Sequence, residues 1–159
     1  MYLIQVLFGC FIVLVLSILP FPFFLSIFMP SWVVLYIIWF NFSKDKSLLF
    51  IPSLIWFMGI MLDMLQQTVL GLHVLALFLM QLFIGKYRLK FKMFPLPQQL
   101  LVVWLATIVY LLTLMLFQVH TNWSWDIGRA FCITIVTAFI WPWIDMMLKP
   151  KLVVKNKLI

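Results

Sequence analysis

The 159-residue chain is 67% hydrophobic and only 9% charged, and its formal net charge is +7. A water-soluble domain carries about 25% charged residues, because its surface faces water. The composition therefore excludes a soluble globular domain and indicates an integral membrane protein. The long apolar runs lack the alternating pattern of a membrane β-barrel, so the predicted fold class is an all-α bundle in one domain, residues 1–159.

Crossing the hydrocarbon layer as a helix takes about 20 apolar residues. The second apolar segment is interrupted by Pro30. Either a helix starts near Phe23 and kinks at Pro30, or residues 21–29 lie at the interface and lead into a short span; we favour the kinked helix. On this basis the sequence predicts six transmembrane helices, at about residues 2–19, 23–42, 48–65, 69–85, 98–119 and 126–148.

Basic residues gather after the second, fourth and sixth predicted spans, and Arg129 is the one exception. Because basic loops stay in the cytoplasm, this pattern places both termini there and supports an even number of spans. The group after span four forms a basic rim, which either reflects topology alone or docks a cytoplasmic partner or anionic lipid. Nucleic acid is not expected as a partner. The basic rim consists of Lys86, Arg88, Lys90 and Lys92.

Asp63 stands out because an ionisable group inside a span costs a few kcal/mol and needs a partner or a function. It follows Gly59 by four residues, so the two share a helix face, and Gly59 would let another helix approach closely. His73 lies at a similar depth and is a candidate partner. Four readings remain open: an interfacial aspartate solvated from the periplasm, a structural ion pair or helix cap, a partner contact, and a substrate or proton pathway.

No arrangement of residues typical of an enzyme is present in the sequence. Neither His73 nor His120 has a metal-ligand companion one helical turn away, and no nucleophile motif or phosphate-binding glycine loop occurs. Cys10 and Cys132 lie in apolar runs, where cysteine acts as a small hydrophobic residue. We therefore expect a non-enzymatic protein without cofactor or metal.

Three short motifs occur in order along the chain, in span two, across the turn from span three to four, and in span six. They are Met29-Pro30-Ser31-Trp32, Gly59-Ile-Met-Leu-Asp63 with Leu70-Gly71-Leu-His-Val-Leu75, and Trp141-Pro142-Trp143. In this order and at these distances the chain resembles the MreD family of bacterial rod-shape-determining membrane proteins, over nearly its whole length. The central motif is the most specific of the three.

The resemblance implies a scaffold subunit of the elongasome, the machine that inserts peptidoglycan along the cell cylinder, in the bacterial inner membrane. Its expected partners are membrane lipids and MreC, and indirectly RodA with its partner transpeptidase and MreB; self-association is left open. The family is also similar in fold to the substrate-binding subunits of energy-coupling-factor transporters. The positions carried over, as structural or partner-contact residues, are Pro30, Trp32, Gly59, Asp63, Gly71, Trp141 and Pro142, which His73 joins through the argument on Asp63. Of these, Gly59 and Gly71 are expected to allow close helix approach around the turn.

The alternative function is a substrate-binding membrane subunit of a small-molecule transporter, of the vitamin type. Such subunits contact their coupling partner through small residues spaced by four positions on the first helix. Here that helix offers Gly9 and Ser17, which are eight positions apart among large apolar residues. The missing motif favours the scaffold.

Overall fold

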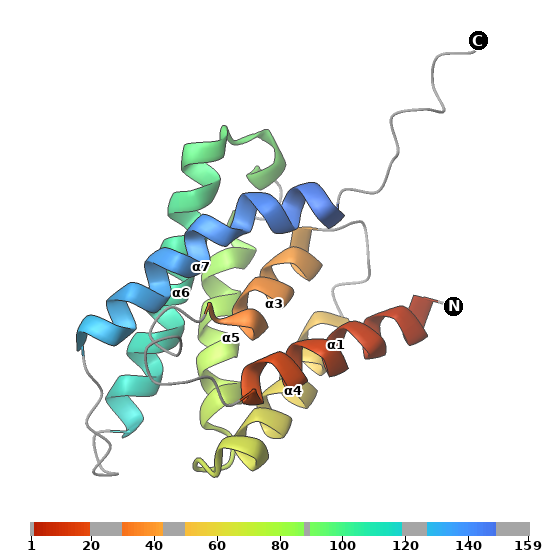
Figure 1. The fold of residues 1–159 in the computed structure, drawn as a ribbon, viewed down its shortest axis with the longest axis vertical. Coiled ribbons are helices and arrows are strands. Elements are labelled where there is room, and N and C mark those ends of the chain that lie inside the picture. Colours follow the sequence, from red (N-terminus) through yellow and green to blue (C-terminus); the bar gives the residue numbers. More distant parts are fainter. Residues whose placement is uncertain (1, 20–29, 43–49, 88–89, 119–126, 149–159) are drawn as a thin grey trace.

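The computed structural model describes residues 2–19, 30–42, 50–87, 90–118 and 127–148 (Figure 1). This part of the chain is all helical and contains no strand, which confirms the predicted class for these residues. It holds six α-helices and one short 3₁₀ helix, η1. They are α1 (Tyr2–Ile18), α3 (Trp32–Phe42), α4 (Phe50–Gln66), α5 (Leu72–Gly85), η1 (Phe91–Met93), α6 (Leu96–Gln118) and α7 (Ile127–Leu148).

Two helices are long and apolar enough to cross a membrane: the stretches Leu96–Phe117 of α6 and Ile127–Ile144 of α7. Helix α6 starts with Pro97 in its first turn, where the missing N–H of proline has no helical partner to lose. The other described helices have 11 to 17 residues. At about 1.5 Å per residue, α3 is roughly 17 Å long and is too short to span a bilayer by itself.

Helix α3 is the centre of the described bundle, because it contacts each of the other five α-helices. In Figure 1 it lies between α1 and α7. A helix that is apolar on every side lies in a protein core or in lipid, and most of α3 is covered by its neighbouring helices. Its buried residues are Val33, Val34, Leu35, Ile37, Ile38, Phe40, Asn41 and Phe42.

The start of α3 differs from the expected helix over 23–42 with a kink at Pro30. Pro30 and Ser31 lie outside any helix, and the first helical bond joins the Leu35 amide to the Ser31 carbonyl, at 3.1 Å. The Ser31 amide donates instead to Thr137 Oγ1 of α7, at 3.0 Å. Because this amide bonds across to α7, the helix begins after Pro30 rather than bending through it. Residues 23–29 lie outside the described residues.

Two side-chain amides join α3 to α5 inside the bundle. Asn41 Nδ2 donates to Gln81 Oε1 at 2.7 Å, and Gln81 Nε2 donates back to Asn41 Oδ1 at 2.8 Å. The second Asn41 donor reaches the Ile37 carbonyl at 2.9 Å. Apolar contacts alone discriminate poorly between helix registers in lipid, so this reciprocal pair sets how α3 and α5 lie against each other.

Replacing both amides of this pair should destabilise the protein by less than the sum of the two single replacements. Asn41→Leu leaves Gln81 without its partner, and we expect a loss of about 1 kcal/mol, as for other hydrogen bonds between membrane helices. Asn41→Leu combined with Gln81→Leu should lose less than the sum of the single variants. Denaturant titration of the purified protein in detergent measures this, and strictly additive losses would contradict a direct pair.

Candidate functional site

The turn between α4 and α5 contains two residues with a left-handed backbone conformation. Gln67 has a φ of 53° and Gly71 a φ of 93°, both in the left-handed region. The Thr68 amide donates to the Asp63 carbonyl at 3.1 Å, a bond that typically closes the C-terminus of a helix. Gly71 then ends the turn and precedes α5, and a glycine takes this conformation without the strain of a Cβ.

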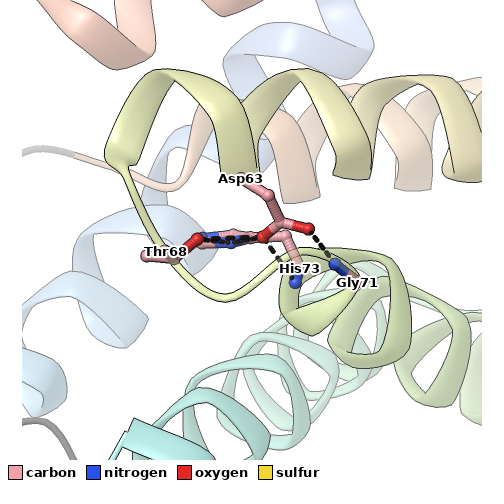
Figure 2. A network of polar contacts seen from close by, with 4 residues as sticks. All are labelled: Asp63, Thr68, Gly71 and His73. Atoms are coloured by element: carbon pink, nitrogen blue, oxygen red, sulfur yellow. Dashed lines mark hydrogen bonds and ion pairs between the residues drawn. The ribbon is translucent and has the colours of Figure 1, made fainter.

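The Asp63 carboxylate lies inside this turn and accepts four hydrogen bonds (Figure 2). Oδ2 accepts the Gly71 amide at 2.7 Å. Oδ1 accepts the Thr68 hydroxyl at 2.9 Å, the His73 amide at 3.1 Å and His73 Nδ1 at 2.6 Å. These bonds replace the water that the buried carboxylate gives up, and hydrogen bonds to a charged acceptor are roughly twice as strong as neutral ones.

Asp63 acts as the N-terminal cap of α5, although it belongs to α4. The first backbone N–H groups of a helix have no partner within the helix. The N-cap position of α5 is Gly71, which has no side chain to accept them. Asp63 accepts the amides of Gly71 and His73, and its negative charge lies at the positive end of the α5 dipole.

His73 completes the polar cluster formed by Asp63, Thr68, Gly71 and His73. A carboxylate can only accept, so the 2.6 Å contact requires that Nδ1 of His73 carry the proton. Both Asp63 and His73 are 1% exposed. The reading of Asp63 as a solvated interfacial residue is therefore wrong, because its neighbours cover it completely. Its geometry is that of a helix cap with a histidine partner.

The two glycines of the central motif have different roles in the structure. A Cβ at Gly59 would lie 2.6 to 2.7 Å from the side chain and backbone of Val74, so α4 and α5 approach closely there, as expected. A Cβ at Gly71 would meet nothing within 4 Å. The expectation that Gly71 also permits close helix approach is wrong, because its contribution is the positive φ.

The remaining motif residues lie in other parts of the bundle. Pro30 is buried and Trp32 half-buried at the start of α3, where Trp32 Nε1 is buried and has no hydrogen-bond partner among the described residues. Trp141 is 1% exposed in α7 and lies edge-on to Phe42 and Phe91, near the opposite end of α5 from Asp63. Pro142 follows it inside α7 and is half-buried. The three motifs therefore do not gather into one site.

The basic rim lies after the C-terminus of α5, with exposed Lys86 and Lys90. Arg88 and the side chain of Lys92 are outside the described part. Within that part, no three His, Cys, Asp or Glu residues cluster in a way that could hold a metal ion.

Sequence reasoning missed several residues that bond inside the bundle. Thr68 is one of them, and a hydroxyl five residues after a buried aspartate can reach its carboxylate. Asn41 and Gln81 are two others, and they are uncharged, so the argument from ionisable groups does not identify them. Uncharged amides within apolar segments were the available signal, since such groups need partners in a membrane.

Gly59→Ala should destabilise the α4–α5 contact, because the added methyl meets the backbone of Val74 and not only its side chain. We expect a loss of about 1–3 kcal/mol, the usual cost of overpacking. Gly128→Ala is the matched control, since a Cβ there meets nothing within 4 Å in another helix. Unfolding in detergent compares the two, and equal stabilities would contradict the close approach.

Asp63→Asn should loosen the start of α5, because one amide N–H group then faces a backbone donor. Losing a bond to a charged acceptor costs about 1.5–3 kcal/mol. Hydrogen exchange should become faster at the amides of Gly71 and His73, while Thr68→Val, which keeps the carboxylate, should change these amides less. Unchanged exchange at both amides in Asp63→Asn would rule out the capping role.

Comparison with known proteins identifies a family for the chain but no solved structure. No solved structure matches the chain. The model of one protein family, described as rod shape-determining protein MreD, matches residues 1–151 of the 159. The match includes all the described helices and all three motifs. The chain therefore belongs to the MreD family of rod shape-determining proteins.

Proposed function

We propose that this protein is a non-enzymatic scaffold subunit of the bacterial inner membrane, which binds MreC and helps to organise lateral peptidoglycan synthesis. Membership of the MreD family implies a role in determining rod cell shape. In this role the protein binds other membrane proteins through contacts on its own surface. The observation that carries it is the fully bonded cluster around Asp63.

Exposed apolar side chains on several helices support a location in lipid. A soluble monomer rarely exposes a contiguous apolar patch of more than a few hundred Å². Here large apolar side chains are exposed on α1, α4, α6 and α7. Exposure to water would be unfavourable for them, but exposure to lipid tails is not. Examples more than half exposed are Phe8, Phe11, Trp56, Leu101, Phe131, Phe139 and Trp143.

The proposed topology has six spans and both termini in the cytoplasm. Its support is the distribution of charge, with ten of the eleven basic residues after even-numbered segments. In this topology the α4–α5 turn faces the periplasm and the basic rim faces the cytoplasm. Helix α5 joins the two, so they lie at opposite ends of the bundle, as its course in Figure 1 illustrates.

The polar cluster favours a contact role over a catalytic one. An ionised carboxylate has about four lone-pair positions, and Asp63 accepts four hydrogen bonds from its own turn. The carboxylate therefore has little capacity left for a substrate or a proton relay. Its bonds instead make the turn rigid, and a rigid surface loses less entropy when it binds a partner.

The outer surface of this turn offers apolar side chains to such a partner. Val69 and Leu70 are 67% and 68% exposed, and Met64 and Leu65 beside them are exposed as well. Polar residues are usual at an exposed turn, so apolar side chains on a rigid one are typical of a contact surface. We propose that MreC binds here, on the periplasmic side.

Leu70→Ser should weaken MreC recovery when the tagged protein is purified from native membranes. The side chain points away from the fold, so the variant should fold and accumulate normally. Asp63→Ala should lower recovery too, through the loosened turn, and should impair cell shape. Ile127→Ser is the matched control, since Ile127 is 79% exposed at the start of α7, on the same proposed side.

Recovery of MreC with the cell-wall synthases by the wild-type protein supports the scaffold. Recovery of a vitamin-uptake ATPase module in their place would overturn it. Normal MreC recovery and normal cell shape in both Leu70→Ser and Asp63→Ala, at normal protein level, would remove the turn from the contact surface.

A further inference from the structure

Backbone hydrogen bonds tie the described residues after α5, Tyr87, Lys90 and Phe91, to the end of that helix and to one another. The Tyr87 amide donates to the Ile84 carbonyl at 2.9 Å, and the amides of Lys90 and Phe91 both donate to the Tyr87 carbonyl, at 3.0 and 2.8 Å. Lys86 and Lys90 have right-handed helical backbone angles. The backbone on both sides of residues 88–89 is therefore held in a defined geometry.

Aromatic packing fixes the inner side of this segment to the bundle. Phe91 is 2% exposed and stacks on Phe42 of α3, with ring centroids 3.6 Å apart and planes within 4°. Trp141 of α7 closes the stack edge-on, 5.6 Å from Phe91. Tyr87 lies against Phe83, with ring centroids 5.4 Å apart. The segment is thus anchored to α3, α5 and α7.

The outer side combines positive charge with exposed apolar surface. The side chains of Lys86 and Lys90 are exposed, and neither has an acidic partner among the described residues. Met93, in η1, is 85% exposed, and Leu96, which opens α6, is 54% exposed. Two lysines beside unpartnered apolar side chains, on an anchored segment at the end of a membrane helix, form an amphipathic surface.

We propose that this surface binds an anionic phospholipid of the inner leaflet, with Lys86 and Lys90 at the headgroup phosphate and Met93 among the acyl chains. The lysines complement the phosphate charge, and Met93 with Leu96 matches the apolar layer directly beneath a headgroup. An acidic protein segment would satisfy the lysines but would leave the apolar side chains in water. Anionic lipid accounts for both halves of the surface.

The anchoring gives this surface more than the general attraction of basic residues to a charged membrane. Long lysine side chains reach the interface from many positions. Here the stack of Phe91 on Phe42 holds the backbone next to Lys90, and Lys86 lies four residues earlier at the end of α5, so both lysines start from backbone that is fixed to the bundle. The inference rests on the membrane placement proposed above and does not depend on MreC binding.

The test uses the full-length purified chain and counts bound lipid by native mass spectrometry. Phosphatidylglycerol is titrated against phosphatidylcholine, which has the same phosphate but no net charge. Each surface lysine contributes about fivefold to the binding of anionic lipid, so Lys86→Gln with Lys90→Gln should weaken phosphatidylglycerol binding about 25-fold. Lys86→Arg with Lys90→Arg keeps the charges and should retain the preference.

Lys155→Gln with Lys157→Gln removes the same charge elsewhere on the proposed cytoplasmic side and should change binding less than about twofold, within one lysine's contribution. An equal loss in the two glutamine pairs would overturn the site and leave only a general charge effect. Unchanged phosphatidylglycerol preference in the Lys86/Lys90 pair would also overturn it. So would displacement of the lipid by glycerol phosphate at equal concentration, because the acyl chains would then contribute nothing.

Two further readouts separate this proposal from others. Unfolding in neutral detergent should be unchanged in the Lys86→Gln, Lys90→Gln variant. If this variant is instead destabilised enough to explain its loss of lipid binding, the lysines stabilise the C-terminus of α5 and do not form a lipid site. MreC recovery should also be normal in this pair. Loss of an acidic protein from native membranes, with lipid binding unchanged, would overturn the lipid assignment in favour of a protein partner.

Discussion

A single negative charge, buried where α4 turns into α5, imposes more conditions on this protein than any other group. The Asp63 carboxylate can be buried only if donors surround it, because an unpaired charge in an apolar interior costs several kcal/mol. The donors are the first amides of α5, a threonine of the turn and a histidine of α5. The same bonds that satisfy the charge also start the helix. The turn, the beginning of α5 and the histidine tautomer all follow from that requirement.

Elsewhere in the bundle several buried polar groups are uncharged, and they too are paired by hydrogen bonds; burying them costs less free energy than burying a charge. Lipid tails are as apolar as leucine, so burial of apolar surface does not by itself choose between helix arrangements in a membrane. The reciprocal bonds of Asn41 and Gln81 orient α3 on α5, and Thr137 receives the amide that begins α3. Gly59 allows the closest approach, between α4 and α5. A few polar and small residues thus define the packing of a chain that is otherwise almost uniformly apolar.

The sequence predicts those features of the fold and the site that depend on residues close together in the chain. The helical class followed from composition, and the pairing of Gly59 with Asp63 on one face followed from their spacing of four. His73 was identified as a partner because a turn of a few residues returns the chain to the same depth. The prediction of close helix approach at Gly71 was wrong, because a glycine in a sequence can indicate either close packing or a positive φ, and the sequence does not show which one applies. The start of α3 and the pairing of Asn41 with Gln81 depend on residues 40 or more positions away: an amide in an apolar segment indicates that a partner is needed, but the local sequence does not say which residue it is.

The central position of α3 has a consequence for how the bundle is assembled. Helix α3 precedes four of the five helices that cover it, and its polar contacts are to residues 40 and 106 positions later in the chain. During synthesis the sides of α3 that later contact α4 to α7 therefore stay uncovered, and Asn41 keeps only its bond to the Ile37 carbonyl until α5 is made. The Ser31 amide gains its hydrogen bond to Thr137 only after α7 is made. Of the described helices, α7 is made last, and its contacts with α3 and α6 are therefore the last of these to form.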